Sequence, residues 1–282
     1  MKRAKGKPKV RARWILAVLG MAALVTGARA WSDTLAEPTV HRTTVAIPDL
    51  PRGTSVSVAL ISDIHVAGPD MPPARLEAIV TQINGLKPDI VAIAGDLVSD
   101  KRTATHIYSP PEIVAPLGRL DAPLGVIVVP GNHDHWFDLP ALTAELDKYG
   151  IRHAANDAIA VGPLIIGALD DAYTGRDDIP ATLAAMGAQG GGSILLSHSP
   201  DPAAEVPADI RLVLAGHTHC GQIAYPWGGA PAHLSEYGDR FACGKIVEGN
   251  RSIIVGAGLG TSLLPIRLFT RPEIWLVTLV GE

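Results

Sequence analysis

The chain has 282 residues, of which 47% are hydrophobic and 18% are charged, and its formal net charge at pH 7 is −4. This length and apolar content suffice for one large hydrophobic core, so we expect one principal domain. Residues 1–30 hold eight Lys or Arg and no Asp or Glu, which leaves 16 basic against 28 acidic residues in the remainder. Because the remainder carries a formal charge of −12, we expect no nucleic-acid partner.

The N-terminus combines a basic segment with an apolar run. Seven Lys or Arg lie within residues 2–13, and the apolar run covers residues 14–28. This order is typical of a signal peptide or a signal anchor. The run is shorter than the about 20 residues that span a bilayer comfortably, and Ala28-Arg29-Ala30 resembles a cleavage site. Residues 1–30 are therefore either a cleaved signal or a retained membrane anchor. Both place the rest of the chain outside the cytoplasm.

Residues 31–55 contain three prolines, and we expect an extended linker there. From residue 56 onward, short apolar segments alternate with amphipathic ones. Strands are predicted at 56–61, 90–94, 125–129, 163–169, 193–197, 210–215, 252–256 and 274–280, and helices at 73–86 and 139–149. Strands rich in Val, Ile and Leu that are separated by helices indicate an α/β fold with covered sheet faces.

Side chains able to bind metal ions follow five of the predicted strands. In chain order they are Asp63, His65, Asp96, Asn132, His133, His198, His217 and His219. Taken singly, an Asp or Asn at such a position is more often a turn residue, and a His more often a hydrogen-bonded core residue. Because α/β folds present functional groups where strands end, five such clusters in one chain indicate a binding site.

The series Asp-x-His, Gly-Asp, Gly-Asn-His-Asp, His and Gly-His-x-His resembles the calcineurin-like metallophosphoesterase superfamily from residue 56 to about residue 280. Segments 195–201, 258–262 and 271–274 further resemble a membrane-associated phosphodiesterase branch, which includes enzymes that hydrolyse UDP-2,3-diacylglucosamine. The resemblance implies a four-layer α/β/β/α sandwich of two mixed sheets, with the catalytic domain at 56–282. It also implies an enzyme that hydrolyses phosphoester bonds.

The same resemblance implies two divalent metal ions, and oxygen and imidazole ligands suit Mn, Fe or Zn. One ion would be bound by Asp63, His65 and His219, the other by Asn132, His198 and His217, and Asp96 would bridge the two. We expect a hydroxide between the ions to attack the phosphorus of the substrate in line with the leaving oxygen. His133 would protonate that oxygen or stabilise the phosphoryl charge.

The chain departs from the family at the carboxylate that orients the catalytic histidine. Many relatives carry a second Asp three residues after the bridging Asp, where this chain has Ser99, followed by Asp100. The sequence therefore leaves the orienting carboxylate unassigned. Asp134 is either an acceptor for a ligand or for His133, or a turn or cap residue.

The two cysteines, Cys220 and Cys243, are not required as ligands in the implied set. An exported domain tolerates disulfides, so we expect a bridge between them that fixes the loop next to His219. The alternative is that both are small apolar side chains without a bond.

Apolar segments near the site, 223–229 and 263–266, bear on the substrate. We expect Trp227 to be exposed in its Pro-Trp-Gly-Gly turn and Ile223 to belong to the core. With the N-terminal segment, they favour a phosphodiester or pyrophosphate that is lipid-linked or nucleotide-linked. A broad phosphomonoesterase and a non-catalytic metal-binding protein are the alternatives. Five further histidines lie outside the implied ligand set: His41, His106, His135, His153 and His233. We expect them at the surface or behind the ligands, and among them we expect His135 to touch the substrate.

Overall fold

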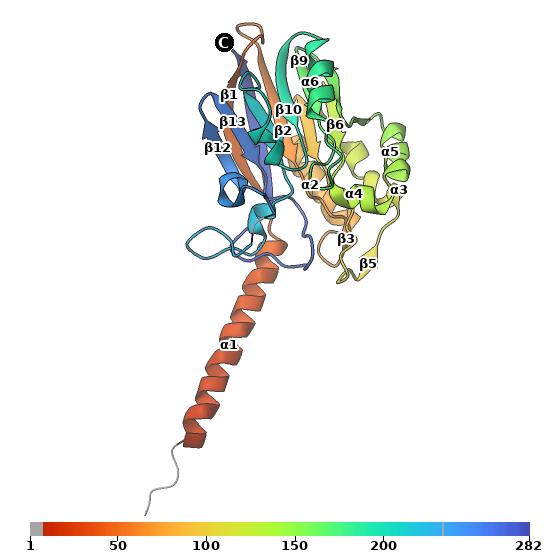
Figure 1. The fold of residues 1–282 in the computed structure, drawn as a ribbon. Helices are drawn as coiled ribbons and strands as arrows, with labels where there is room; N and C mark the ends of the chain where they lie inside the picture. Colours follow the sequence, from red (N-terminus) through yellow and green to blue (C-terminus); the bar gives the residue numbers. More distant parts are fainter. Residues whose placement is uncertain (1–7, 233) are drawn as a thin grey trace, which may run out of the picture.

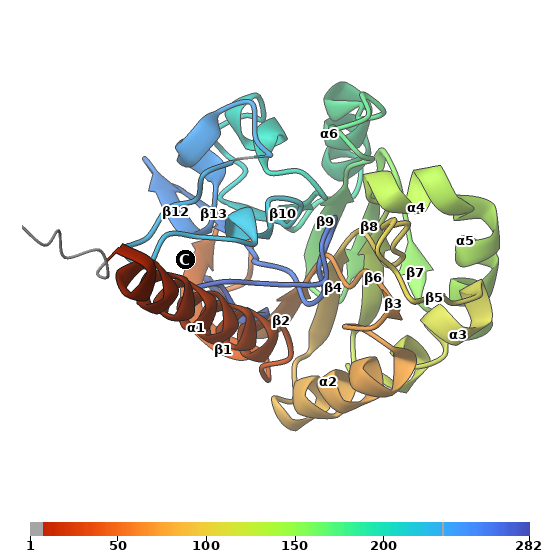
Figure 2. The same cartoon turned by 90° about the horizontal axis from the view of Figure 1, so that it is seen from below.

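The computed structural model describes residues 8–232 and 234–282. Two six-stranded sheets lie face to face, and helices cover their outer faces (Figures 1 and 2). Each sheet contains parallel and antiparallel pairs, so the predicted α/β/β/α sandwich of two mixed sheets is confirmed. The predictions for the basic residues at positions 2–7 and for His233 lie outside the described residues.

The first sheet contains three strands that lead into the predicted site. Its order is β1 (Thr39–Ile47), β14 (Glu273–Gly281), β2 (Ser55–Ile61), β4 (Ile90–Ala94), β6 (Gly125–Val129) and β7 (Arg152–His153). Only the β14–β2 pair is antiparallel among the described pairs of this sheet. Every residue of β4 is buried, as expected for a parallel strand with both faces covered.

The second sheet supplies the other two site strands. Its order is β12 (Gly244–Glu248), β13 (Arg251–Val255), β11 (Leu212–Ala215), β10 (Gly192–Leu196), β9 (Leu164–Ala168) and β8 (Asp157–Val161). The inner pairs are parallel, and the two outer pairs are antiparallel. A separate pair, β3 (Ala67–Gly68) and β5 (His106–Ile107), lies outside both sheets.

The helices pack on the outer faces because their apolar residues recur on one side. They are α2 (Pro73–Gly85), α3 (Pro110–Val114), α5 (Leu139–Lys148) and α6 (Ile179–Gly187). The short helix α4 (Asn132–Phe137) instead buries the polar residues Asn132, His133 and Asp134. In α2 the four residues at helical spacing, Leu76, Ile79, Val80 and Ile83, are all buried against the first sheet. A second core fills the space between the sheets, and a third lies under α6. The predicted strands and helices are all present, within one or two residues of the expected bounds.

The prediction of a linker at 31–55 is wrong in its central part. Residues 39–47 are extended, but they form β1 and pair in parallel with the whole of β14. Val45 and Ile47 point into the core, and the ring of His41 stacks on Trp275 with the centroids 4.7 Å apart. The prolines at 38 and 48 flank the strand, which is where an edge strand tolerates them.

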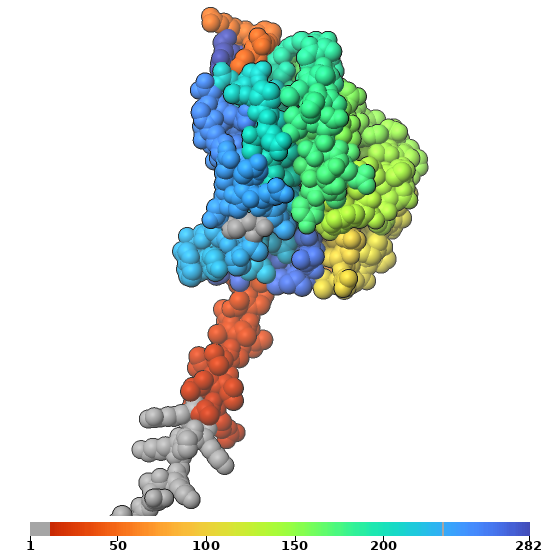
Figure 3. Space-filling model, in the orientation of Figure 1, coloured from red at the N-terminus to blue at the C-terminus, as the bar shows by residue number. Residues whose placement is uncertain are grey.

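Helix α1 (Pro8–Thr34) projects from the domain (Figures 1 and 3). Its segment Ala12–Thr34 is the one described helix that is long and apolar enough to cross a membrane, by length and composition. Its last turn is bound to the domain. The Asp33 carboxylate accepts a hydrogen bond from the backbone N–H of Phe269 at 3.1 Å, and the Thr34 hydroxyl accepts one from that of Arg267 at 2.6 Å.

The predicted disulfide between Cys220 and Cys243 is present, with the two Cα atoms 4.8 Å apart. It ties the turn after β11 to the start of β12, 23 residues further along the chain. Because the first cysteine directly follows His219, the bond restrains a loop that carries one of the predicted ligands.

We predict that replacing both cysteines, Cys220→Ser with Cys243→Ser, lowers the free energy of unfolding by roughly 3 kcal/mol, because the unfolded chain regains the entropy of an open loop. Denaturant titration followed by circular dichroism measures this change. The wild-type protein with its disulfide reduced serves as the control and should unfold with the double variant. Equal midpoints for the oxidised wild type and the variant would contradict the prediction.

Candidate metal centre

The eight predicted site residues converge at one edge of the two sheets. They follow the carboxyl ends of β2, β4 and β6 in the first sheet and of β10 and β11 in the second. Every one of them is buried: Asp63, His65, Asp96, Asn132, His133, His198, His217 and His219. Residues up to 156 positions apart in the sequence thus form one compact cluster of nitrogen and oxygen atoms.

The first predicted ligand set is Asp63, His65 and His219. The Nε2 atoms of the two histidines lie 3.1 Å apart, and His219 Nε2 lies 3.5 Å from Asp63 Oδ1. One ligand atom from each residue lies within 4.8 Å of the others, so a single cation would be in reach of all three. The set therefore has the geometry of a metal-binding triad.

The second predicted set is Asn132, His198 and His217, and Asp96 lies between the two sets. His198 Nε2 lies 3.1 Å from Asn132 Oδ1 and 3.1 Å from His217 Nδ1. The Asp96 Oδ2 atom is 3.3 Å from Nε2 of His198 in this set and 3.5 Å from Nε2 of His65 in the first. A carboxylate in this position is within reach of two cations.

Hydrogen bonds behind the cluster orient two of the imidazole rings. His65 Nδ1 lies 3.0 Å from the carbonyl oxygen of Val98, and His198 Nδ1 lies 2.8 Å from that of Ala94. Because a carbonyl oxygen only accepts, each Nδ1 carries a proton. The Nε2 atom of His65 then presents its lone pair to the cluster, and that of His198 would do so once a bound cation displaces its second proton. Fixing the tautomer in this way is what proteins do for histidines that bind metals.

The electrostatics of the cluster favour a bound cation. Burial lowers the pKa values of His65 and His219 well below the ordinary range, and burial together with the charge of His198 lowers that of His217 to about 3. These three rings are neutral and able to bind a metal ion.

Burial, reinforced by the charge of Asp96, raises the pKa of Asp63 to about 6. Burial opposes a charge on His198 as well, yet Asp96 and Asp63 raise its pKa to about 10. The buried carboxylates therefore draw positive charge into the cluster, and divalent ions would supply it.

The backbone adopts an unusual conformation at five of the predicted ligands. The φ angle is positive at Asp63, His65, Asp96, His217 and His219, with values between 48° and 69°. Residues other than glycine rarely occupy this left-handed region, and such strain concentrates at functional sites. The turns that aim these side chains at one point are therefore held by the surrounding fold.

The glycines of the motifs leave space for the carboxylates. A Cβ atom at Gly131 would lie 2.3 Å from Asp96 Oδ1, and one at Gly216 would lie 2.5 Å from Asp63 Oδ2. Both carboxylates also accept backbone hydrogen bonds: Asp96 from the N–H of His133 at 2.9 Å, and Asp63 from that of His217 at 3.0 Å. In the Gly-Asn-His and Gly-His motifs, the glycine leaves space for a carboxylate and a following residue donates a backbone hydrogen bond to it.

The structure identifies the carboxylate that orients His133. The Nδ1 atom of His133 lies 2.5 Å from Oδ1 of Asp100, which is half exposed at the rim of the cluster. Asp100 stands one position later than the family's usual Asp, and the loop after β4 brings it to the same histidine. The sequence contained this signal as an acidic residue next to the expected position.

The structure also decides between the two roles predicted for Asp134. Its carboxylate accepts hydrogen bonds from the backbone N–H groups of Asp96, Leu97 and Gly131 at 2.8 to 3.0 Å. The residue therefore ties the loop after β4 to the start of α4 and bonds neither to His133 nor to a predicted ligand side chain in the described structure. Of its two predicted roles, the turn or cap role is confirmed.

Three residues of the site were not found by sequence analysis. The centroid of the Tyr173 ring lies 4.6 Å from that of His217, and the centroid of the Trp136 ring lies 5.0 Å from that of His133. Arg267 is fully buried, and its Nη2 atom lies 3.3 Å from Nδ1 of His219. No motif contains Tyr173 or Arg267, and Trp136 is three residues beyond His133 with no feature that marks it.

A pocket of about 140 Å³ opens over the cluster. Its lining includes Asp96, Asn132, His133, His217 and His219 from the predicted set, with Trp136, Tyr173, Leu234, Ser262 and Leu263 around them. By contrast, His135 pairs with Asp170, with Nε2 and Oδ1 2.6 Å apart, and does not line this pocket.

Residues 56–221 match the sequence profile of the calcineurin-like phosphoesterases, which is more than half of the chain. The chain therefore belongs to this family. It is a metallophosphoesterase, a hydrolase that cleaves phosphoester bonds with the help of divalent metal ions.

Two relatives illustrate its place in the family. The chain is 34% identical over 211 residues to the uncharacterized metallophosphoesterase YkuE of Bacillus subtilis (strain 168), covering 72% of each protein. It is 30% identical over 280 residues to the transmembrane protein with metallophosphoesterase domain of Bos taurus, covering 92% of this chain and 60% of the bovine one.

Among solved structures, the 5'-nucleotidase precursor from Thermus thermophilus overlaps 73% of this chain and 49% of its own. The identity is 12% and the TM-score is 0.47, a level of similarity that carries no information about the substrate.

We predict that chelation of divalent ions abolishes hydrolysis of bis-p-nitrophenyl phosphate and that added Mn²⁺ or Zn²⁺ restores it. The variant His198→Ala should bind less metal than the wild type, because it removes a nitrogen that lies within 3.3 Å of three other predicted ligands. Inductively coupled plasma mass spectrometry of the dialysed proteins measures the metal. Full metal content in the variant would contradict the predicted ligand set.

We predict that His133→Asn lowers kcat about 10²- to 10⁴-fold and leaves the metal content unchanged, because it removes a proton donor and no ligand. Asp100→Asn should lower kcat less, since the imidazole remains but loses the carboxylate that orients it. Asp170→Asn, in the similar pair with His135, is the matched control and should keep normal kcat. A loss of metal in His133→Asn would overturn the assignment.

Proposed function

We propose that this chain is a membrane-anchored phosphodiesterase or pyrophosphatase with two metal ions and a lipid-linked substrate. The observation that carries the proposal is that the cluster of predicted metal ligands lies next to an apolar cleft. The first ion would be held by Asp63, His65 and His219 and the second by Asn132, His198 and His217, with Asp96 bridging. Two divalent ions held in this way activate water and neutralise the phosphoryl oxygens.

The chain's own groups supply positioning and proton transfer. Asp100 accepts a hydrogen bond from Nδ1 of His133 and fixes the orientation of the ring. With Nδ1 bound to Asp100, Nε2 is the nitrogen of His133 that would transfer a proton to the leaving oxygen of the substrate. The backbone N–H groups of His133 and His217 hold the two carboxylates in place before the substrate arrives, so the site needs little reorganisation.

The lining of the central pocket favours a diester over a monoester. A monoester brings one more negative charge than a diester near neutral pH, and a charge in a partly buried site requires a partner. Among the described residues that line the 140 Å³ pocket, none is Lys or Arg. The ions would then face a dianion with no cationic side chain to assist them, so the singly charged diester suits the pocket better.

The apolar cleft supports a lipid-linked substrate. It has a volume of about 290 Å³ and shares His219, Leu234, Ser262 and Leu263 with the central pocket. Ile223 and Leu264 add further apolar surface. An acyl or isoprenoid chain bound there would place its phosphate over the metal cluster. Burial of hydrocarbon in the cleft would provide affinity of about 25 cal/mol for each Å² removed from water.

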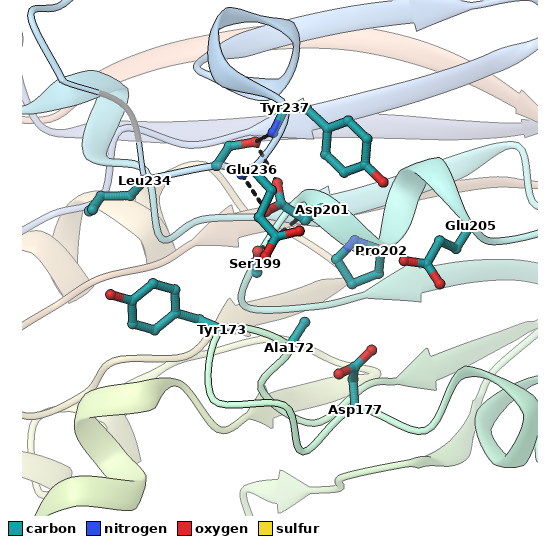
Figure 4. Close-up of a pocket in the computed structure, with 11 residues that line it drawn as sticks. Ala172, Tyr173, Asp177, Ser199, Asp201, Pro202, Glu205, Leu234, Glu236 and Tyr237 are labelled. Carbon is teal, nitrogen blue, oxygen red and sulfur yellow. Dashed lines mark hydrogen bonds between the residues drawn. The ribbon is translucent and has the colours of Figure 1, made fainter.

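An acidic pocket on another side of the site argues against a nucleotide-linked substrate. It has a volume of about 450 Å³ and is lined by Asp177, Asp201, Glu205 and Glu236. Figure 4 shows Tyr173 and Leu234, which also line the central pocket, at one side and the carboxylates of Asp177 and Glu205 at the other. Four carboxylates repel a second phosphate group and suit a hydroxyl- or amine-bearing group.

Retention of α1 as an anchor is the interpretation of residues 1–30 that the contacts favour. The helix continues without interruption through Ala28-Arg29-Ala30 and ends at Thr34. The Thr34 hydroxyl donates to the Ala30 carbonyl oxygen, and Arg75 donates to the Thr34 carbonyl oxygen. Cleavage after Ala30 would break the helix at the point where it joins the domain. With the basic flank inside, the domain would lie outside the cytoplasm.

We predict that the purified protein hydrolyses bis-p-nitrophenyl phosphate with a higher kcat/KM than p-nitrophenyl phosphate, as released p-nitrophenol would show. A lipid-linked phosphodiester in detergent micelles should be preferred over a water-soluble nucleotide diester. Leu234→Asp, which places a charge at the junction of the pockets, should reduce the lipid activity more than the p-nitrophenyl activity. A preference for the monoester would indicate a broad phosphomonoesterase instead.

A further inference from the structure

The metal centre and α1 lie at the same end of the first sheet. β1 begins five residues after α1 ends and runs parallel to β14, which is antiparallel to β2. β2 therefore runs back toward α1 (Figure 1). Asp63 and His65 follow shortly after its last residue, Ile61. A bilayer that holds α1 would thus face the edge of the sheets that carries the site.

No flexible segment separates α1 from the domain. Residues 12–29 are exposed, whereas Ala30, Asp33 and Thr34 are buried in the domain surface. The exposed run of about 18 residues is about 27 Å long at about 1.5 Å per residue, which is close to the about 30 Å of a hydrocarbon core. In a bilayer spanned by α1, the domain surface around the end of the helix would therefore lie at the level of the lipid headgroups.

Exposed apolar side chains gather on this surface. We call them the apolar collar: Trp31, Leu35, Tyr225, Trp227, Leu263, Leu264 and Phe269, which are 40% to 80% exposed. They lie at the end of α1 and on two loops that run side by side, since Ala224 N–H donates to the carbonyl oxygen of Leu268 and Gln222 donates to that of Leu264. Figure 1 shows both loops at the end of the domain from which α1 projects.

The chemistry of the collar matches that of a membrane interface. Tryptophan and tyrosine are enriched at the headgroup level, where one part of the ring is apolar and the other is polar. Arg29 and Arg271 both contact Asp33, and each side chain remains half exposed beside the collar. The Arg29 guanidinium lies over the Phe269 ring, 5.4 Å from its centroid. A contiguous exposed apolar surface of this kind marks an interaction site.

We propose that the apolar collar seats the catalytic domain on the phospholipid bilayer that α1 spans. This inference rests on the proposed membrane anchoring. Leu263 and Leu264 belong to the collar and also line the apolar cleft, so the cleft opens toward the bilayer surface. A lipid-linked substrate then reaches the metal centre without leaving the membrane, and its hydrocarbon part remains in an apolar environment throughout.

The test compares the full-length wild type with Tyr225→Ser/Trp227→Ser, which changes the collar and leaves the cleft and the metal ligands intact. Both are reconstituted in vesicles of equal parts phosphatidylcholine and phosphatidylglycerol, with acyl chains brominated near the headgroup. Trp227 is one of five tryptophans. If it contacts the bilayer, bromine quenches it, and the double variant loses that part of the quenching. Equal bromine-dependent quenching in both proteins would overturn the proposal.

Val247→Ser is the matched control, because Val247 is an exposed apolar residue on β12, paired with Ser252 near the amino end of β13 and thus far from the site. It should keep the quenching of the wild type. If the collar instead binds a second copy of this chain, bromine quenching would be the same in the wild type and the double variant. The double variant would then show a smaller dimer fraction in cross-linking. That result would also refute the bilayer contact.

Hydrolysis of a soluble and of a vesicle-embedded substrate distinguishes failure of the bilayer contact from failure of the proposed function. The double variant should hydrolyse soluble bis-p-nitrophenyl phosphate at the wild-type rate and a vesicle-embedded phosphodiester several-fold more slowly. If the wild type does not cleave the embedded lipid at all, the lipid substrate is refuted, while the quenching, which needs no catalysis, still decides whether the collar contacts the bilayer.

Discussion

The burial of two carboxylates among four imidazoles, three of them neutral, is the constraint on which the rest of the structure depends. Asp63 and Asp96 are both shielded from water, and their nearest polar neighbours are histidines whose own pKa values are mostly depressed by burial. Such an arrangement is costly unless cations compensate it. The fixed tautomers of His65 and His198, the backbone donors to both carboxylates and the strained turns are consistent with a site built for that compensation.

The sandwich provides this site by bringing the carboxyl ends of parallel strands from two sheets to one edge. Loops carry most of the polar groups, the first turn of α4 carries Asn132 and His133, and a few contacts fix these segments. Asp134 joins the loop after β4 to the start of α4, and the disulfide restrains the turn after His219. The buried strands fix where the loops begin, and the hydrogen bonds and the disulfide fix the loops themselves. Together they hold the eight side chains in position although no single helix or strand carries them all.

The surroundings of the metal cluster differ in character from one side to the other. The cleft along Leu263 and Leu264 is apolar, whereas the pocket beyond Tyr173 carries four carboxylates. The apolar side coincides with the end of the domain where α1 is attached, because β2 returns to the level at which β1 began. One topology thus places α1, the apolar loops and the predicted metal ligands at the same end of the domain.

The sequence by itself determined eight strands, the helices α2 and α5, the fold class and the eight polar residues, because hydrophobic periodicity and short motifs are local properties. The shorter helices α3, α4 and α6 were not predicted. It misplaced residues 39–47, since an edge strand between two prolines resembles a linker until its partner β14 is known. Only the tertiary structure decided that Asp100 holds His133, that Asp134 ties two loops together, and that Tyr173 and Arg267 adjoin the ligands. These contacts join positions 33 to 48 residues apart, and no local pattern encodes which of many similar polar residues the packing of two sheets will bring together.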